Sequence, residues 1–198
     1  MLTIRKGGHK DIERYYSMME VDFDSEELLS KLAIHRAVMK GEMELLILFD
    51  DESKMELGYA LVGIRNLYGY VFLKYFGILP WYRGHGVGIE AMRLFHKRYA
   101  EAQGIIAEIT DFPDADENRQ KKLFKFFARF GYEEIPSDFR ISGTTAHVMV
   151  KGIKGTAEIG KVYHRILLDF YQRYLSAPAM ARMLDIHSVR QETGKDEK

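Results

Sequence analysis

Apolar residues in the first forty positions recur every three to four residues, which is the period of an amphipathic helix. The first predicted helix carries its apolar face on Ile12, Tyr15, Tyr16 and Met19. Asp24 and Glu27 have the spacing of a capping box, so a second helix is predicted to start at Asp24 and to end at Gly41. Its predicted stripe is Leu28, Leu29, Leu32, Arg36 and Met39.

The pattern then changes to short runs rich in β-branched, Leu and aromatic residues, at 44–49, 57–64 and 70–79. Short polar connections join these runs, which predicts three antiparallel strands in a meander. A short strand at 3–5 precedes the helices. Another buried strand is predicted at 105–110, after a helix that Gly104 ends, and this order makes it parallel to the third strand of the meander.

Helical spacing returns in the second half of the chain. One predicted helix carries Leu123, Phe124, Phe126, Phe127 and Phe130, and a strand follows at 146–150. After Gly152 comes a strongly amphipathic helix with Ile159, Val162, Tyr163, Ile166, Leu167, Phe170 and Tyr174 on one face. Pro178 breaks it, and a short helix with Met180, Met183 and Leu184 precedes a polar, frayed tail. We therefore divide the chain into a main domain, 1–152, and a helical extension, 153–198.

Composition excludes several classes of function. Lys plus Arg and Asp plus Glu both number 29, so the chain lacks the broad positive field of a nucleic-acid binder. The absence of Cys excludes disulfides, thiolate nucleophiles and Cys-based zinc sites, and the seven His residues show no metal-ligand spacing. No apolar run approaches the ~20 residues of a membrane span, and no signal peptide begins the chain. We expect a cytoplasmic protein without a metal, a nucleic-acid partner or a membrane anchor.

The most informative stretch is Arg83-Gly84-His85-Gly86-Val87-Gly88, between a predicted strand and a predicted helix. Glycines let the backbone approach a phosphate, and the helix start adds its positive dipole end. A dinucleotide-binding loop would need a third Gly at position 89, which is Ile. The stretch 155–162 is one residue short of a P-loop and has Val162 where Ser or Thr should bind magnesium. Both alternatives stay open, and an acyl-CoA loop is favoured over them.

The motif Arg83-x-x-Gly86-x-Gly88, placed after Ile78-Leu79-Pro80, resembles the acyl-CoA loop of the GNAT N-acetyltransferase superfamily. The order of the predicted elements over residues 1–152 is similar to that family as well, including the Gly131 that ends the helix before the last strand. The resemblance implies an α+β fold, an α/β sandwich. Its mixed central sheet would have an antiparallel meander, a splayed parallel strand pair and flanking helices, with the C-terminal helical extension added.

The resemblance also implies a reaction. Acetyl-CoA would be the co-substrate, with its pyrophosphate on the amides of Arg83, Gly84, His85, Gly86, Val87 and Gly88. Its pantetheine arm would lie along Ile78 and Leu79. A primary amine would attack the thioester directly, in the gap between the splayed strands. Because such an amine is mostly protonated at pH 7, a general base is useful, and Glu108 matches the family position for it.

Two positions depart from the family pattern. Phe127 stands where many members carry a Tyr that protonates the leaving thiolate, and Phe cannot donate a proton. The family Asn has its nearest counterparts in Asn118, offset by two, and in Gln120, which has the right spacing. We count Asn118 and Phe127 among the predicted acetyl-CoA contacts.

These departures keep two other functions open, a non-catalytic acyl-CoA-binding or regulatory module and a structural interaction domain. The apolar face of the extension must be buried, on its own sheet or on another subunit. The second case predicts a homodimer through the C-terminal helices.

Overall fold

The computed structural model describes residues 1–65, 69–110, 117–135, 140–141, 144–152 and 159–185 of the 198-residue chain. Within these ranges the side chains at 117–119, 159–162, 164 and 182–185 are not described. The strand order is β1-β2-β3-β4-β5-β8-β7-β9, and β6 also pairs with β8. The strands are β1 (Leu2–Lys6), β2 (Met43–Asp50), β3 (Glu56–Gly63), β4 (Tyr70–Ile78), β5 (Gly104–Thr110), β6 (Glu133–Ile135), β7 (Arg140–Ile141), β8 (Thr144–Gly152) and β9 (Leu184–Asp185).

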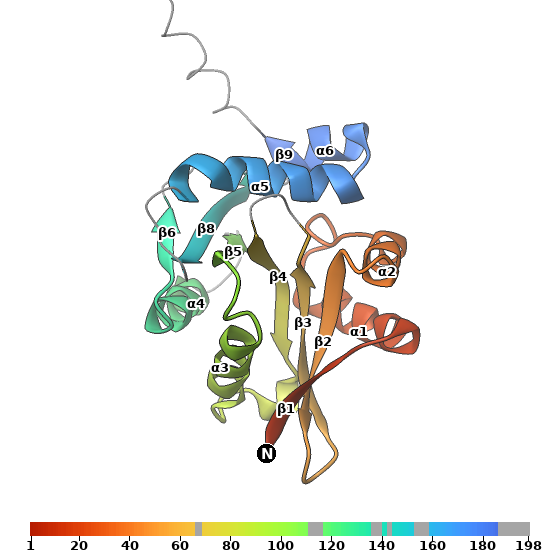
Figure 1. Cartoon of the computed structure of the whole chain (residues 1–198), viewed down its shortest axis with the longest axis vertical. Coiled ribbons are helices and arrows are strands. Elements are labelled where there is room, and N and C mark those ends of the chain that lie inside the picture. The colour runs from red at the N-terminus through yellow and green to blue at the C-terminus, as the bar shows by residue number, and fades with distance from the viewer. Residues whose placement is uncertain (66–68, 111–116, 136–139, 142–143, 153–158, 186–198) are drawn as a thin grey trace, which may run out of the picture.

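Helices cover both faces of this sheet (Figure 1). They are α1 (His9–Asp22), α2 (Lys31–Met39), α3 (Val87–Arg98), α4 (Glu117–Arg129), α5 (Ile159–Tyr174) and α6 (Ala177–Met183), with a single 3₁₀ turn, η1 (Pro80–Tyr82), before α3. The buried residues of α1, α2 and α5 share one cluster with one face of the strands. Those of α3 and α4 share a second cluster with the opposite face. The result is a three-layer arrangement with the sheet in the middle.

The sheet is mixed, as the sequence predicts. β2, β3 and β4 form an antiparallel meander, because the connections between them are short. β4 and β5 pair in parallel, because α3 carries the chain back across one face of the sheet. The predicted α+β fold class is therefore confirmed, including the C-terminal helical extension.

The predicted start of the second helix is wrong. α2 begins at Lys31, and the N-cap is Ser30, whose side chain accepts a hydrogen bond from the amide of Ala33. The predicted stripe is wrong in part as well, since Leu32 and Met39 are 57% and 62% exposed. The helix buries Ile34 and Ala37 instead.

A contact with β4 explains this difference. The hydroxyl of Tyr75 accepts a hydrogen bond from the amide of Leu29 and donates one to the carbonyl of Glu27, both at 2.8 Å. These two backbone groups are thereby fixed outside any helix. A tertiary contact thus overrides the local capping signal of Asp24 and Glu27.

Gly104 is not the helix terminator that the sequence predicts. α3 already ends at Arg98, and Gly104 is the first residue of β5. A Cβ at Gly104 would lie 2.7 Å from the ring of Tyr70 and 2.8 Å from the carbonyl oxygen of Lys151. The glycine is therefore required by the close packing of three strands.

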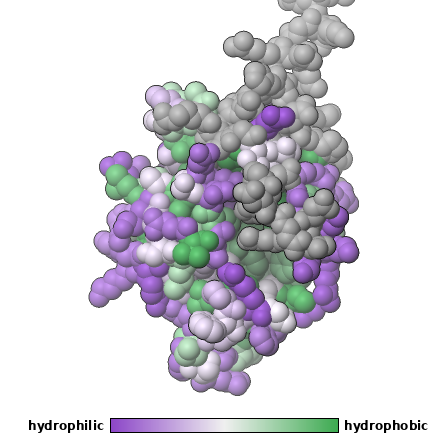
Figure 2. Space-filling model, turned by 180° about the vertical axis from the view of Figure 1, so that it is seen from behind, coloured by the Kyte–Doolittle hydropathy of each residue, from purple (hydrophilic) through white to green (hydrophobic). Residues whose placement is uncertain are grey.

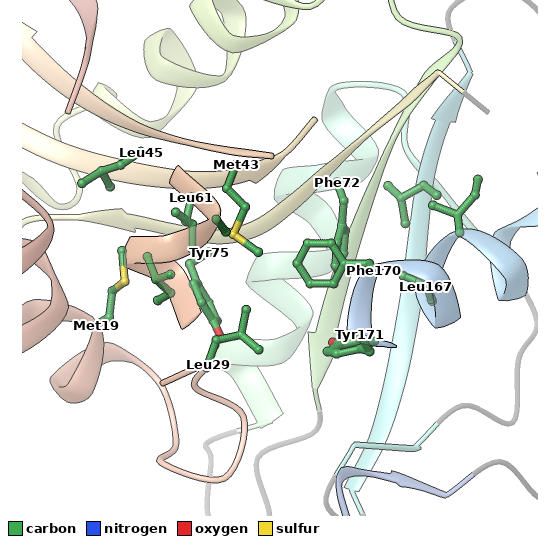
Figure 3. Packing of buried hydrophobic residues seen from close by; sticks show 14 of the residues in the cluster. Met19, Leu29, Met43, Leu45, Leu61, Phe72, Tyr75, Leu167, Phe170 and Tyr171 are labelled. Carbon is green, nitrogen blue, oxygen red and sulfur yellow. The ribbon is translucent and has the colours of Figure 1, made fainter. Parts of the chain in front are cut away.

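The extension packs on the sheet of its own chain. Tyr163, Ile166, Leu167, Phe170 and Tyr171 of α5 are buried in the cluster that also contains α1, α2 and β4. The ring of Phe170 lies edge-on to that of Phe72 in β4, with 4.5 Å between the centroids (Figure 3). The sequence left open whether this apolar face is buried on its own sheet or on another subunit, and in the structure it is buried on its own sheet. The domain boundary at residue 152 stays a prediction, and α5 shares its core with the preceding residues.

In the view opposite to that of Figure 1, hydrophobic residues form small separate areas among hydrophilic ones (Figure 2). None of the described helices is both long and apolar enough to cross a membrane. The near P-loop at 155–162 and the polar tail fall on residues or side chains outside the described part of the chain.

Candidate active site

The parallel pairing of β4 and β5 stops halfway along both strands. The last paired residues are Leu73 and Ala107. Beyond them β4 continues to Ile78 against β3, and β5 continues to Thr110 against β8. The facing edges of the two strands are therefore not paired with each other. This opening, the β4–β5 gap, is the splayed strand pair that the sequence predicts.

The glycine loop lies at the end of β4. Gly86 is the N-cap of α3, and Gly84 and Gly86 have φ angles of +80° and +81°, in the left-handed region that favours glycine. No atom lies within 4 Å of a Cβ built at either position. Among the hydrogen bonds of the described residues, none uses the amides of residues 84–88. Free amides beside a helix N-terminus can hold an anion such as a pyrophosphate.

Two nitrogens of the Arg83 side chain donate hydrogen bonds to other residues of the chain. Nε donates to the carbonyl of Ile78 and Nη2 donates to Asp22 Oδ1, both at 2.7 Å. Asp22 Oδ2 in turn accepts from the hydroxyl of Tyr59 at 2.8 Å. Arg83 therefore ties the end of α1 to the glycine loop, while half of its side chain stays exposed. Its contact with a phosphate stays a prediction.

Ile78 and Leu79 differ in what their backbone groups can still bind. The amide of Leu79 donates to the carbonyl of Leu57 in β3, and its carbonyl accepts from the amide of Tyr82, both at 2.9 Å. Backbone groups alternate between the two edges of a strand, so those of Ile78 face the β4–β5 gap, where its carbonyl already accepts the hydrogen bond from Arg83 Nε. Pantetheine contacts at both residues stay predictions, and Ile78 is the one that faces the gap.

A β-bulge in β4 brings a lysine to the same gap. Leu73 pairs with Val62 of β3 and Tyr75 pairs with Leu61, so Lys74 is the extra residue of the bulge. The bulge places Lys74 and Tyr75 on the face that α1, α2 and α5 cover. The Nζ atom of Lys74 lies 5.0 to 5.7 Å from the ring centroids of Phe72, Tyr75 and Tyr171. Lys74 was not among the predicted site residues, although it is a lysine within an otherwise apolar strand.

Lys74, Glu108 and Tyr171 form a buried hydrogen-bonded network. Lys74 Nζ donates to Glu108 Oε2 at 3.0 Å and to the hydroxyl of Tyr171 at 2.7 Å. That hydroxyl donates to the same Oε2 at 2.5 Å. The side chains of Lys74 and Glu108 are 4% and 3% exposed, and Tyr171 is fully buried. A buried carboxylate requires such compensation, and the ammonium group of Lys74 supplies the opposite charge.

Glu108 also lines a cavity of about 60 Å³. Its second carboxylate oxygen, Oε1, is buried and has no hydrogen-bond partner among the described residues. The cavity has room for several water-sized groups. It lies between the α1–α2 connection, the β4–β5 gap and α4. Its lining consists of Phe23, Glu27, Lys74, Tyr75, Glu108, Ile109, Thr110, Leu123 and Ile141.

Three other ionisable groups lie at this cavity or in the network. Burial raises the pKa of Glu27, although a hydrogen bond with Thr110 acts in the opposite direction. Burial raises the pKa of Tyr75, whose hydroxyl already bonds two backbone groups. Burial, followed by the charge of Glu108, raises the pKa of Tyr171 well above its ordinary value. Tyr171 is therefore a neutral phenol that can donate its proton to a hydrogen bond at physiological pH.

The other predicted contacts lie apart from this network. Phe127 is 5% exposed and packs in the cluster of α3 and α4, with its ring centroid 5.0 Å from that of Tyr132. Asn118 is in α4, but its side chain is outside the described part. His85 is exposed, and Val87 and Gly88 are half-buried at the loop. No group of three or more His, Asp or Glu among the described residues is arranged to hold a metal ion.

Comparisons with known proteins find similarity in fold. No protein-family model matches the sequence, and no curated protein matches it in sequence. A protein from Bacteroides thetaiotaomicron, described as an acetyltransferase of the GNAT family, has a TM-score of 0.65 and 17% identity. The match covers 85% of this chain and 96% of that chain.

Two further solved structures hold ligands. Arabidopsis thaliana NAA60, in complex with a bisubstrate analogue, has a TM-score of 0.59 at 13% identity, over 79% of this chain and all of that chain. Spermidine N-acetyltransferase from Vibrio cholerae, with CoA and spermine, has a TM-score of 0.58 at 10% identity, over 76% of this chain and 95% of that chain. The shared fold thus extends over most of the chain in each case.

Proposed function

We propose, from the premise that this chain has the GNAT fold, that it transfers an acetyl group from acetyl-CoA to a primary amine. One observation carries the proposal. The unpaired edges of β4 and β5 lie between two features: a glycine loop with unbonded amides, and a cavity lined by Glu108, whose Oε1 has no partner among the described residues. The first feature suits a phosphate, and the second suits a group that must lose a proton.

The residues present fit acetyl-CoA. The amides of residues 84–88 would hold its pyrophosphate, because they make no hydrogen bond to a described residue and lie next to the N-terminus of α3. The amide of Arg83 donates to the carbonyl of Pro80 at 3.3 Å, so a phosphate contact of Arg83 would come from its side chain. The pantetheine arm would follow the backbone of Ile78 into the β4–β5 gap. The CoA and the bisubstrate analogue in the two neighbouring structures support a site for such a ligand.

Glu108 would act as the general base. An amine with a pKa of about 10.4 must lose a proton before it attacks, at a cost of about 4.6 kcal/mol at pH 7. Oε1 would take that proton, the amine nitrogen would bond to the thioester carbon, and the carbon–sulfur bond would break. The second proton of the amine nitrogen would then pass to water or to the departing thiolate, which leaves the neutral amide. The CoA leaves as a thiolate whose conjugate acid has a pKa of about 8.5. A thiolate of this kind can leave without a proton donor, so the reaction does not need the Tyr that Phe127 replaces.

The charges around the cavity favour a cationic acceptor. Two carboxyl groups, those of Glu27 and Glu108, line it together with one ammonium group, that of Lys74. The spermine bound in the neighbouring spermidine N-acetyltransferase is an example of such an amine. The extension 153–198 would complete the site, because Tyr171 belongs to the network at Glu108. Assembly as a homodimer through the C-terminal helices stays a prediction.

Two measurements on the purified full chain test the function. Calorimetry should show binding of CoA. Thiol release from acetyl-CoA should depend on an added amine, with spermidine, lysine amide and a short peptide with a free N-terminus as the acceptors. Absence of CoA binding would contradict the proposal as a whole. CoA binding without thiol release in the presence of any of the three amines would indicate the non-catalytic acyl-CoA-binding module.

A further inference from the structure

Only one of the two carboxylate oxygens of Glu108 accepts hydrogen bonds from the described residues. Both donors of the network, the ammonium group of Lys74 and the hydroxyl of Tyr171, bind Oε2. Oε1 of the same carboxylate has no partner among the described residues, although it is buried. Burying a carboxylate oxygen without a hydrogen-bond partner costs free energy. The unpartnered Oε1 of Glu108 therefore indicates a position where a ligand can donate a hydrogen bond.

We propose that Tyr171 and Lys74 are positioning residues that hold Glu108 through Oε2 and leave Oε1 for the acceptor amine. The inference rests on the proposed function and adds α5 to the site. Lys74 comes from the bulge of β4, Glu108 from β5 and Tyr171 from α5, so each of three elements supplies one member of the network.

Two bonds to one oxygen restrict the rotation of the carboxylate group. Each donor also favours the ionised form, which is the form that accepts a proton. The charged or titratable groups that face Glu108 are Lys74, Tyr171, Glu27 and Tyr75. Of these, Tyr171 can be changed without removing a charge, because Phe retains its ring. The packing of Tyr171 against Phe72 and Phe170 should therefore persist in Tyr171→Phe.

Steady-state kinetics of Tyr171→Phe give the first test, with spermidine and acetyl-CoA as substrates. We expect kcat to fall about 10-fold, the effect of one hydrogen bond to a charged group. The KM for acetyl-CoA should stay within about twofold, because the glycine loop is untouched. The acid limb of the pH–rate profile should move, since Oε2 of Glu108 loses a hydrogen-bond donor. Tyr163→Phe is the matched control, because it removes another buried hydroxyl from the same helix, and its pH profile should not move.

A double variant separates positioning from simple stabilisation of the fold. If Tyr171 acts through Glu108, Tyr171→Phe should change kcat by less than about twofold when Glu108→Gln is already present. Equal effects of Tyr171→Phe in both backgrounds would overturn the proposal. An acid limb that stays in place in the single variant would overturn it as well.

A third measurement needs no acceptor and no CoA. In protein labelled with ¹³C at the glutamate Cδ, the signal of Glu108 is identified by its loss in Glu108→Gln. Its chemical shift at pH 7 should differ between Tyr171→Phe and the wild type, because Oε2 loses one hydrogen-bond donor, and it should be unchanged in Tyr163→Phe. An equal chemical shift of Glu108 in all three proteins would overturn the positioning role. Loss of acetyl transfer in the wild type would instead contradict the proposed function, so the two failures are distinguishable.

Discussion

Single residues at the site act through their surroundings. Glu108 lies in a strand of apolar residues, and burial alone would favour its neutral form. Lys74 and Tyr171 supply the compensation that keeps a carboxylate in this place. A similar case is Asp22, which binds Arg83 and Tyr59 at once and thereby fixes the glycine loop to α1. In both cases the chemistry of one side chain is set by partners far away in the sequence.

Glu108→Gln retains the shape of the side chain and removes its basicity. We expect turnover to fall by about 10²-fold or more, within the usual range for loss of a general base. CoA affinity, measured by calorimetry, should stay within about threefold, because the loop is on another part of the site. Turnover within a few-fold of the wild type would show that another group accepts the proton.

Gly86→Asp tests the glycine loop. The position has a left-handed φ of +81°, and the new carboxylate would lie where the pyrophosphate is expected. CoA affinity should fall at least 10-fold, about 1.4 kcal/mol. Gly41→Asp is a matched control, since Gly41 also has a left-handed φ, +68°, and also has open space at its Cβ. Equal CoA binding by the folded Gly86→Asp and Gly41→Asp variants would contradict the assignment of the loop.

At the scale of elements, α5 has two roles that its amphipathic pattern does not separate. Its apolar residues cover the face of the sheet beside α2, and one turn of the helix carries both Phe170 and Tyr171. Phe170 packs on Phe72 of β4 (Figure 3). The hydroxyl of Tyr171 donates a hydrogen bond to Glu108 of β5. A loss of α5 should therefore affect stability and catalysis together.

Leu167→Ala tests the first role alone. Leu167 is fully buried, so its truncation should lower the free energy of unfolding by about 2–5 kcal/mol. Leu168→Ala, at a half-buried position of the same helix, should cost less. Urea unfolding measures both. Removal of all residues after Gly152 should have a larger effect, seen as a lower melting temperature or loss of the soluble protein. A truncated chain as stable as the whole would show that α5 is detached in solution.

The pH dependence of stability belongs to the whole molecule, and the half-buried His96 in the last turn of α3 contributes to it. Its Nε2 lies 3.1 Å from the hydroxyl of Tyr132, and its ring packs against Phe130. Burial, with a smaller contribution from the charge of Lys151, lowers the pKa of His96 to about 4. The unfolded chain, with an ordinary histidine pKa of about 6.5, therefore binds a proton more readily than the folded chain does.

The sign of the effect follows from this difference. His96 contributes its full stability above about pH 6.5, and that contribution is lost as the pH falls from about 6.5 toward 4. Urea midpoints at pH 7 and pH 5 measure the loss. We expect His96→Gln to lose less stability than the wild type between these two values. An equal loss in both proteins would show that His96 titrates normally in the fold.

The sequence by itself determined the elements and most of their connections. Periodicity and glycine positions are local signals, so they predicted the meander, the parallel strand pair and the amphipathic extension correctly. The motif from Arg83 to Gly88 is also local, because a helix start and its preceding loop are adjacent in the chain. Glu108 was selected as a base from a resemblance, and that role stays a prediction.

Only the tertiary structure decided which side chains meet. Lys74 and Tyr171 are 97 residues apart, and a β-bulge that no local pattern predicts brings them together. Tyr75 moved the start of α2 to Lys31 through hydrogen bonds across 46 and 48 residues. The extension covers its own sheet because Phe72 and Phe170 fit against each other there. Contacts over such distances depend on how whole layers pack, and the order of residues within one element does not encode them.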